Sequence, residues 1–175
     1  MASEFVIRDL RFEDFNDLVN AYFSYYDESK SNQNLGITLF KRKPTLKEEV
    51  AWFKEMYVKV LDGDVIVKVA EADGAAVGLC SVTRQRPGSE RDHTGVLGIA
   101  IKKAYRGRGV GRALMESTLK RCKGTFEQVI LEVFESNARA QSLYKKMGFK
   151  GYGKIPKAIK RGERYINVNL MYLCL

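Results

Sequence analysis

Residues 99–112 read Ile99-Ala100-Ile101-Lys102-Lys103-Ala104-Tyr105-Arg106-Gly107-Arg108-Gly109-Val110-Gly111-Arg112. An apolar strand runs here through a basic glycine loop into the start of a helix. Because glycine has no Cβ, the backbone can adopt positive φ and bring several N–H groups close to one ligand. The start of a helix adds unpaired N–H donors and the positive end of its dipole. With three arginines nearby, the stretch favours binding of a pyrophosphate.

The spacing of the glycines narrows the class of ligand. The P-loop pattern G-x-x-x-x-G-K-[ST] is absent, which argues against a nucleotide triphosphatase. The dinucleotide pattern G-x-G-x-x-G is not met either, because the third glycine comes one residue early. What remains is R-x-x-G-x-G at Arg106, Gly109 and Gly111. With this spacing the sequence resembles the GCN5-related N-acetyltransferases, whose pyrophosphate loop binds coenzyme A. From the loop alone, a glycine turn with solvated arginines is the alternative.

Length and composition indicate one domain without metal or membrane span. The chain has 175 residues, 45% hydrophobic and 29% charged, which is typical of a globular protein with its own core. No run of about 18 apolar residues predicts a transmembrane helix. Residues 1–6 lack a basic region followed by an apolar one, which argues against an export signal. Three scattered cysteines and one histidine favour neither a disulfide framework nor a zinc site, so we expect a cytoplasmic protein.

The formal net charge of +9 permits attraction to polyanions. The sequence has no zinc finger, RNP signature or basic heptad region, and its basic residues are spread through most segments. A solvated basic surface with a local anion site is therefore favoured over a nucleic-acid-binding protein.

Hydrophobic periodicity and turn signals predict the order β-α-α-β-β-β-α-β-α-β-β. Strands are expected at 5–10, 65–70, 76–83, 93–101 and 129–134, with a final pair from 149 to 173 that turns near Arg161-Gly162. Helices are expected at 13–30, 45–61, 110–122 and 137–147. Thr45 and Glu48 have the spacing of a capping box at the second helix. The order predicts an α/β fold (an α+β sandwich) of helices on a mixed sheet.

A second motif strengthens the resemblance. Leu131-Glu132-Val133 is followed by Ser136-Asn137-x-x-Ala140-x-x-Leu143-Tyr144-x-x-x-Gly148-Phe149. This pattern is identified as motif B of the acetyltransferase family. It follows motif A, which contains the loop at Arg106, Gly109 and Gly111, at the expected distance, and together the motifs cover residues 94–149. The resemblance implies a seven-stranded, mostly antiparallel sheet flanked by four helices, and a single acetyltransferase domain over residues 1–175.

The family implies transfer of an acetyl group from acetyl-CoA to a primary amine by direct attack, without metal. The acceptor is a small amine, an amino-acid derivative, or a protein α-amino or lysine group. A homodimer is compatible with the sequence, and no membrane contact is expected. The alternative is a non-catalytic coenzyme A-binding or nucleic-acid-binding module on the same fold, since a fold does not fix an activity.

By resemblance, acetyl-CoA contacts the strand and loop of motif A together with two residues of motif B. These residues are Ile99, Ala100, Ile101, Arg106, Gly107, Arg108, Gly109, Val110, Gly111, Arg112, Asn137 and Tyr144. The pantetheine arm can pair with a strand edge as an added strand does, and the strand N–H groups offer an oxyanion donor. Gly95 and Gly98 upstream indicate a bulge or a close backbone approach, and would let this strand separate from residues 129–134.

Four residues are candidates for the chemistry. By resemblance Tyr144 is the general acid, although its apolar helix face also fits a core tyrosine. Asn137 can cap a helix and contact the cofactor or a water. The general base is open between two residues. Glu132 stands inside an apolar run, where a carboxylate is costly unless paired or functional. His93 begins the other cleft strand, and the alternatives are a structural carboxylate and a surface histidine.

Two further regions can border the acceptor site. Tyr25 and Tyr26 line a substrate mouth or, the favoured reading, cover the edge of the core. The C-terminal hairpin carries Asn167 where many relatives carry Asp, so an amine contact taken from those relatives is in doubt.

Overall fold

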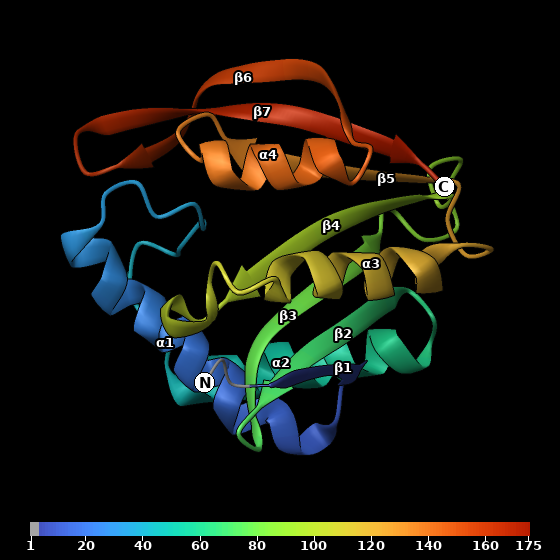
Figure 1. Cartoon of the computed structure of the whole chain (residues 1–175), viewed down its shortest axis with the longest axis horizontal. Coiled ribbons are helices and arrows are strands. Elements are labelled where there is room, and N and C mark those ends of the chain that lie inside the picture. Colours follow the sequence, from blue (N-terminus) through green and yellow to red (C-terminus); the bar gives the residue numbers. More distant parts are fainter. Residues whose placement is uncertain (1–3) are drawn as a thin grey trace.

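Seven strands form one sheet in the order β1-β2-β3-β4-β5-β7-β6 (Figure 1). The strands are β1 (Phe5–Asp9), β2 (Val65–Ala72), β3 (Ala75–Arg84), β4 (Thr94–Ile101), β5 (Gln128–Phe134), β6 (Lys150–Arg161) and β7 (Arg164–Cys174). The computed structural model describes residues 4–175. Residues 1–3, which begin the segment used above to argue against an export signal, lie outside the described residues.

The pairing of the strands confirms the predicted mixed sheet. Every neighbouring pair is antiparallel except β4 and β5, which are parallel. A parallel pair needs a crossover, and the helix α3 (Val110–Cys122) supplies it. The glycine loop lies between β4 and this helix, so the loop is placed at the C-terminal end of β4.

Helices cover both faces of the sheet (Figure 1). The others are α1 (Phe15–Ser31), α2 (Leu46–Leu61) and α4 (Ala138–Lys146), with short 3-10 helices η1 (Phe12–Asp14) and η2 (Lys103–Tyr105). One core cluster joins α3 and α4 to the sheet through residues such as Leu114, Met115 and Leu131. A second joins α1 and α2 to the opposite face through Leu18 and Phe53. The predicted sandwich is confirmed.

Local sequence chemistry sets the start of α2. The Thr45 side chain accepts a hydrogen bond from the Glu48 N–H, and the Glu48 carboxylate accepts one from the Thr45 N–H at 2.8 Å. The predicted capping box is therefore confirmed, and it satisfies donors that the first turn would leave unpaired.

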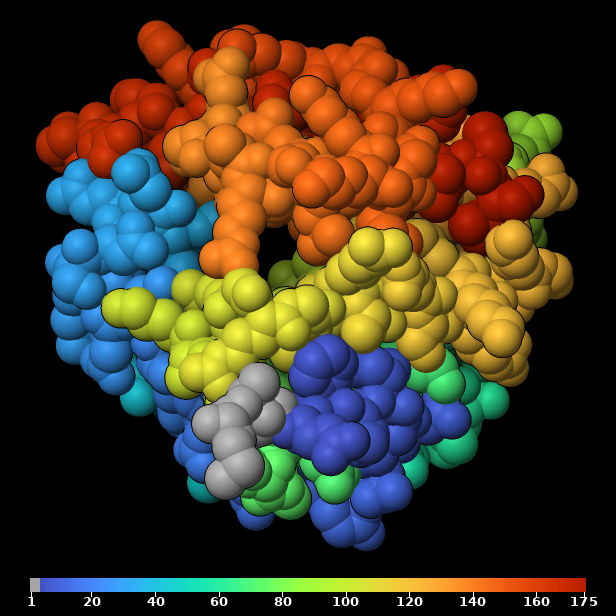
Figure 2. Space-filling view, in the orientation of Figure 1, coloured from blue at the N-terminus to red at the C-terminus, as the bar shows by residue number. Residues whose placement is uncertain are grey.

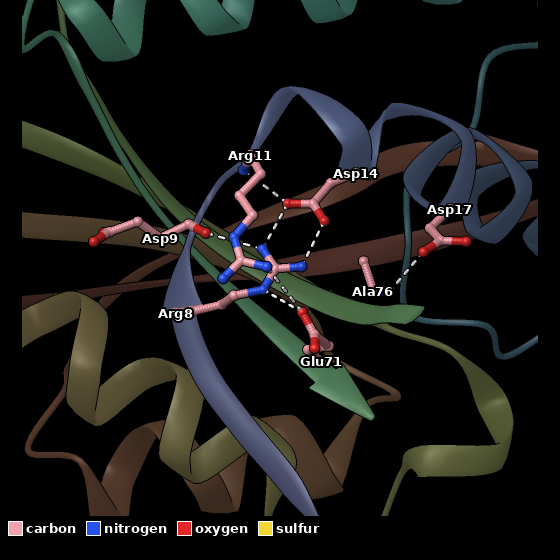
Figure 3. A network of polar contacts seen from close by, with 7 residues as sticks. All are labelled: Arg8, Asp9, Arg11, Asp14, Asp17, Glu71 and Ala76. Carbon is pink, nitrogen blue, oxygen red and sulfur yellow. Dashed lines mark hydrogen bonds and ion pairs between the residues drawn. The ribbon is translucent and has the colours of Figure 1, made fainter. Parts of the chain in front are cut away.

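A buried ion-pair network fixes the N-terminal segment on the sheet (Figure 3). Arg8 on β1 donates to both oxygens of Asp14 in η1, at 2.6 and 2.8 Å, and to Glu71 on β2. Burial would raise the pKa of Asp14, but the hydrogen bonds from Arg8 and from the Arg11 N–H lower it on balance. In the same view Asp17 reaches from α1 to the N–H of Ala76, at 2.8 Å. These contacts set the position of α1 over the sheet.

Two observations bear on the environment of the chain. Within residues 4–175, no helix combines the length and apolarity needed to cross a bilayer. Cys80, Cys122 and Cys174 are free thiols. Burial raises the pKa of Cys80 and of Cys122 to about 12, so neither is a thiolate near neutral pH.

Candidate active site

The parallel strands β4 and β5 diverge. Their pairing is confined to Thr94–Val96 against Gln128–Ile130, although β4 continues to Ile101. A Cβ on Gly95 would lie 2.3 Å from Cγ1 of Val82, so the close backbone approach expected there is confirmed. The other alternative, a bulge, is not found, because β4 keeps an unbroken register with β3 from Gly95 to Ile101. Each strand stays in register with its other neighbour, β4 with β3 and β5 with β7, while the two strands separate from one another.

This divergence leaves one edge of β4 open. The Lys102 N–H donates to the Val77 carbonyl of β3 at 2.8 Å. Since backbone groups alternate in direction along a strand, Ala100 also faces β3, whereas Ile99 and Ile101 turn toward the open edge. Ile99 and Ile101, two of the three residues predicted to bind the peptide-like pantetheine arm, thus present backbone groups to the open edge. The third, Ala100, directs its N–H toward β3. The Ile101 carbonyl accepts from Nε of Arg106 at 2.8 Å.

A cavity of about 460 Å3 adjoins this open edge. Figure 2 shows it as a hollow near the centre of the view, between the orange side chains of α4 and the yellow ones at the start of α3. We call it the first cavity. Its lining comes from β4, the glycine loop, α4 and the segment after α1: Asn32, Asn34, Leu35, Gly36, Ile37, Ile99, Ala100, Ile101, Arg106, Gly107, Gly109, Gly111, Arg112, Asn137, Arg139, Ala140, Leu143 and Tyr144.

The glycine loop has the conformation that its composition predicts. Gly107 and Gly109 both have φ of +85°, a region that residues with a Cβ rarely adopt. Gly109 is the N-cap of α3, and Val110, the first residue of that helix, is buried beneath the loop. The N-terminal N–H groups of α3 therefore lie at the mouth of the first cavity, where they can bind an anion.

The arginines differ from expectation. The sequence suggested three guanidinium groups open to a pyrophosphate, but Arg106 donates to both oxygens of Glu28 on α1, at 2.7 and 2.9 Å. Arg112 pairs with Glu116 at 2.7 Å and remains exposed, and Arg108 lies over the ring of Tyr105. Arg106 thus connects the glycine loop to α1 through this ion pair.

Arg139 is a cation that the sequence argument missed. It lines the first cavity, and its Nη2 atom would lie 2.6 Å from a Cβ on Gly107. The motif gave no signal for it, because Arg139 stands at an unspecified position between Asn137 and Ala140. The residues at 32–37 were missed as well, because they carry no motif and reach the cavity only by folding back from α1.

We expect Arg106→Ala to lower the free energy of unfolding by about 2–3 kcal/mol, because Glu28 would keep a buried charge without its partner. The Glu28 side chain is 6% exposed and that of Arg106 is 27% exposed. The hydrogen bonds from Arg106 hold the pKa of Glu28 below its ordinary value of 4.5. The pair therefore stabilises the fold above that pH, and its contribution is lost on acidification. Urea unfolding at pH 7 and pH 4 measures both effects.

The matched control is Arg112→Ala, because the pair of Arg112 with Glu116 is exposed and should contribute little. Equal stability losses in the two variants would contradict the stabilising role assigned to the ion pair of Arg106 with Glu28.

Tyr144 and Asn137 lie where the sequence places them. Tyr144 is 7% exposed and belongs to the core cluster, yet it also lines the first cavity. Burial raises the pKa of Tyr144 to about 12, so its hydroxyl stays protonated near neutral pH. Asn137 caps α4 by accepting from the Ala140 N–H at 3.1 Å, which confirms its capping role. Both readings of each residue, structural and cavity-lining, hold together.

The two candidates for the general base are not brought to this cavity. His93 precedes β4 at the end where β4 and β5 still pair, and it lines a separate polar pocket with Arg91 and Tyr172. The expectation that His93 stands at the cleft is wrong, since seven residues of strand put it about 23 Å from Ala100. The expected burial of Glu132 is also wrong. Its neighbours Leu131 and Val133 are buried, whereas Glu132 is exposed on the other face of β5.

A second cavity, of about 830 Å3, lies on the α1 and α2 side of β4. It shares Ile37, Ile99 and Ala100 with the first cavity. The two cavities therefore meet at the same short segment of β4 from opposite faces of the sheet. Tyr25 lines the second cavity while being 3% exposed, so it both covers the core edge and borders a mouth.

The C-terminal hairpin supports the segment that borders both cavities. Arg161 at the tip of β6 donates to the carbonyls of Leu35 and Ile37, at 2.8 and 2.7 Å. Asn167 accepts from the Lys157 N–H at 2.9 Å and donates to Glu135 at 2.8 Å. The amide at 167 thus braces an irregular part of β6, and Arg161 holds the loop rather than facing solvent.

The comparisons agree with this architecture. Residues 13–149 match the Acetyltransferase (GNAT) family, and the chain belongs to it. The family resemblance and the predicted fold are both confirmed.

Two curated relatives and one solved structure illustrate the likeness. The L-amino acid N-acetyltransferase AaaT of Escherichia coli K12 is 34% identical over 59% of this chain. An N-alpha-acetyltransferase of Sulfurisphaera tokodaii is 40% identical over 47% of it. The matches span 64% and 54% of those two proteins. The Salmonella typhimurium protein yncA, solved with its cofactor acetyl-CoA, superimposes with a TM-score of 0.79 at 20% identity, covering 98% of this chain and 94% of that one.

Proposed function

We propose that this protein transfers an acetyl group from acetyl-CoA to a primary amine. The observation that carries the proposal is the meeting of two cavities at one segment of β4 that has an open edge. A donor in the first cavity and an acceptor in the second can then approach one another across Ile99 and Ala100. Family membership, and relatives named as N-acetyltransferases, support the same reaction.

The residues around the first cavity fit coenzyme A. A loop with two glycines at positive φ leaves room for a pyrophosphate beside the N–H groups of α3, and Arg139 adds charge. The open edge of β4 suits the peptide-like pantetheine arm, with the backbone groups of Ile99 and the N–H of Ile101 as its partners, since the Ile101 carbonyl is taken by Arg106. Acetyl-CoA supplies the acetyl group in activated form, as a thioester.

The chain contributes binding, orientation and a proton. The backbone N–H groups of β4 at the open edge are donors for a developing oxyanion. Tyr144 holds a proton at Oη, and we assign it the protonation of the departing sulfur as the nitrogen–carbon bond forms and the carbon–sulfur bond breaks. The proton released by the attacking amine leaves on the opposite side of β4. Neither Glu132 nor His93 lines the second cavity, so water is the candidate acceptor of this proton.

The proposal extends to the setting of the enzyme. Residues 1–175 act as one acetyltransferase domain, the acceptor is an amino-acid derivative, small amine or protein amino group, and free thiols fit a reducing cytoplasm.

The test is calorimetric titration with acetyl-CoA followed by a thiol-release assay over amines and peptides. We expect saturable one-site binding, and thiol release that depends on an amine. Absence of acetyl-CoA binding would contradict the proposal. Salt-dependent binding of polyanions without thiol release would favour the nucleic-acid-binding alternative.

A further inference from the structure

The second cavity contains an acidic side chain that the proposed mechanism does not use. Glu49 on α2 is 4% exposed and lines this cavity. Within residues 4–175 its carboxylate has no hydrogen-bond or ion-pair partner. Burial, and secondarily the charge of Glu48, raise the pKa of Glu49 above its ordinary value. Among the described residues no buried side-chain nitrogen or oxygen lacks a partner, so the unpaired carboxylate oxygens of Glu49 reach the cavity and are open there to a cationic group from outside the chain.

The other charged residues around this cavity are already engaged or exposed. Glu48, its acidic neighbour, receives hydrogen bonds from Arg42 at 2.5 and 2.9 Å and from the Thr45 N–H. These contacts lower the pKa of Glu48 to about 2. Lys41 is exposed at the rim, and Arg42 is occupied by Glu48. Glu49 is thus the acidic group of this cavity that remains open to a ligand.

The rest of the wall is largely apolar and aromatic. It includes Tyr22, Tyr25, Phe40 and Trp52. Phe40 is 71% exposed and Trp52 is 44% exposed, although both are large apolar side chains. An exposed aromatic pair at the rim of a cavity is a recognition surface for an apolar group. The volume of about 830 Å3 is sufficient for a ligand the size of an arylalkylamine.

We propose that Glu49 anchors the ammonium group of the acceptor, and that the second cavity selects primary amines attached to an aromatic or bulky aliphatic group. This inference rests on the proposed function, because it names the acceptor class of that reaction. A carboxylate binds an ammonium through charge-assisted hydrogen bonds, and the aromatic walls cover the apolar body of the amine. The ammonium has no lone pair, so it gives one proton to water before its nitrogen attacks the acetyl carbon. The same chemistry occurs in free arylalkylamines, in amino-acid amides and at protein N-termini with apolar first residues.

A direct binding experiment tests the inference without requiring turnover. Trp52 is the single tryptophan of the chain and lines the cavity, so its emission reports occupancy. With the full chain saturated with coenzyme A, we expect 2-phenylethylamine to bind about tenfold more tightly than methylamine or 2-phenylethanol. Glu49→Gln should weaken 2-phenylethylamine about tenfold and leave 2-phenylethanol unchanged. Equal affinity of the variant and wild type for 2-phenylethylamine would overturn the anchor.

Two controls separate an anchor from a structural carboxylate. Glu55→Gln removes an exposed acid from the same helix and should leave binding unchanged. The Tm of Glu49→Gln should be no lower than that of wild type at pH 7, because the substitution removes a charge that its surroundings disfavour and breaks no hydrogen bond or ion pair within the described residues. A lower Tm would instead show that Glu49 supports the fold.

Thiol release then distinguishes this inference from the proposed function. Phenylalaninamide and a peptide beginning with Phe identify the source of the amine, and turnover on either supports the acceptor class. If the emission of Trp52 shows that amines bind in the second cavity but no amine causes thiol release, the proposal that the protein is an acetyltransferase is wrong. Thiol release that is equal in wild type and Glu49→Gln, or that is faster with methylamine than with 2-phenylethylamine, would sink the acceptor assignment alone.

Discussion

Tyr144→Phe should lower kcat about 100-fold and leave the Kd for acetyl-CoA nearly unchanged, because a positioned acid contributes roughly 10²–10⁴-fold to a proton-transfer step. The ring of Tyr144 packs on Phe149 with centroids 6.0 Å apart and would be retained by Phe. Its hydroxyl has no hydrogen-bond partner within the described residues, and it lines the first cavity. Removal of that hydroxyl therefore changes the chemistry of the cavity far more than its packing.

The stability of Tyr144→Phe distinguishes a catalytic role of Tyr144 from a role in core packing. A hydroxyl without a protein partner contributes little, so the Tm of Tyr144→Phe should match that of wild type. Tyr57→Phe, on α2 and away from both cavities, is the matched control for the loss of a phenol. Steady-state thiol release and acetyl-CoA titration supply kcat and Kd. Unchanged kcat in Tyr144→Phe would remove the residue from the mechanism.

The pH dependence follows from the position of the same group. Because burial raises the pKa of Tyr144 to about 12, the phenol keeps its proton throughout the range in which the protein is assayed. Any decline of the wild-type rate below about pH 10 should therefore persist in Tyr144→Phe. If the wild-type rate fell with rising pH below about pH 10 and the rate of Tyr144→Phe did not, the result would contradict the raised pKa of Tyr144.

Local chemistry is what the sequence predicted well. The capping box at Thr45, the cap at Asn137 and the positive φ of Gly107 and Gly109 each depend on residues a few positions apart. Their outcome is fixed by backbone geometry and short-range hydrogen bonds, so the motifs carry it. The separation of β4 from β5 was also predictable, through the family resemblance that the two motifs support.

Contacts between distant segments explain the failures. Arg106 was expected to face a ligand, but it pairs with Glu28, which lies 78 residues earlier in the chain. No motif or spacing in the sequence predicts this pair. His93 was placed at the cleft because it shares a strand with the binding segment, yet a strand of this length carries its two ends to different pockets. Glu132 was expected to be buried because its run is apolar, although its side chain is on the opposite face of β5 from Leu131 and Val133 and is exposed there.

The second cavity was outside the reach of sequence argument for the same reason. Its wall combines α1, the segment after it, α2, β3 and β4, and no two of these share a motif. Glu49 reads in sequence as an ordinary acid in the first turn of a helix, where a carboxylate is favoured by the helix dipole. Its burial beside aromatic side chains became visible only in the folded chain.

Gly107→Val should raise the Kd for acetyl-CoA about 100-fold or more. Gly107 has φ of +85°, which a β-branched residue strongly disfavours, and the new Cβ would meet the Arg139 guanidinium at 2.6 Å. The new side chain displaces the flexible end of Arg139, and the unfavourable φ shifts the loop, so that both Arg139 and the converging N–H groups move away from the pyrophosphate. Loss of two hydrogen bonds to a charged group, at about 1.5–3 kcal/mol each, gives this change in affinity.

Gly74→Val provides the matched control for Gly107→Val. Gly74 has φ of +75° in the turn between β2 and β3, and a Cβ there would have no atom within 4 Å. The two variants therefore suffer comparable backbone strain, of about 1–2 kcal/mol, and should lose comparable stability. Only Gly107→Val should lose acetyl-CoA binding in calorimetry. An equal loss of binding in both would attribute the effect to general destabilisation, and retained binding in Gly107→Val would place the pyrophosphate elsewhere.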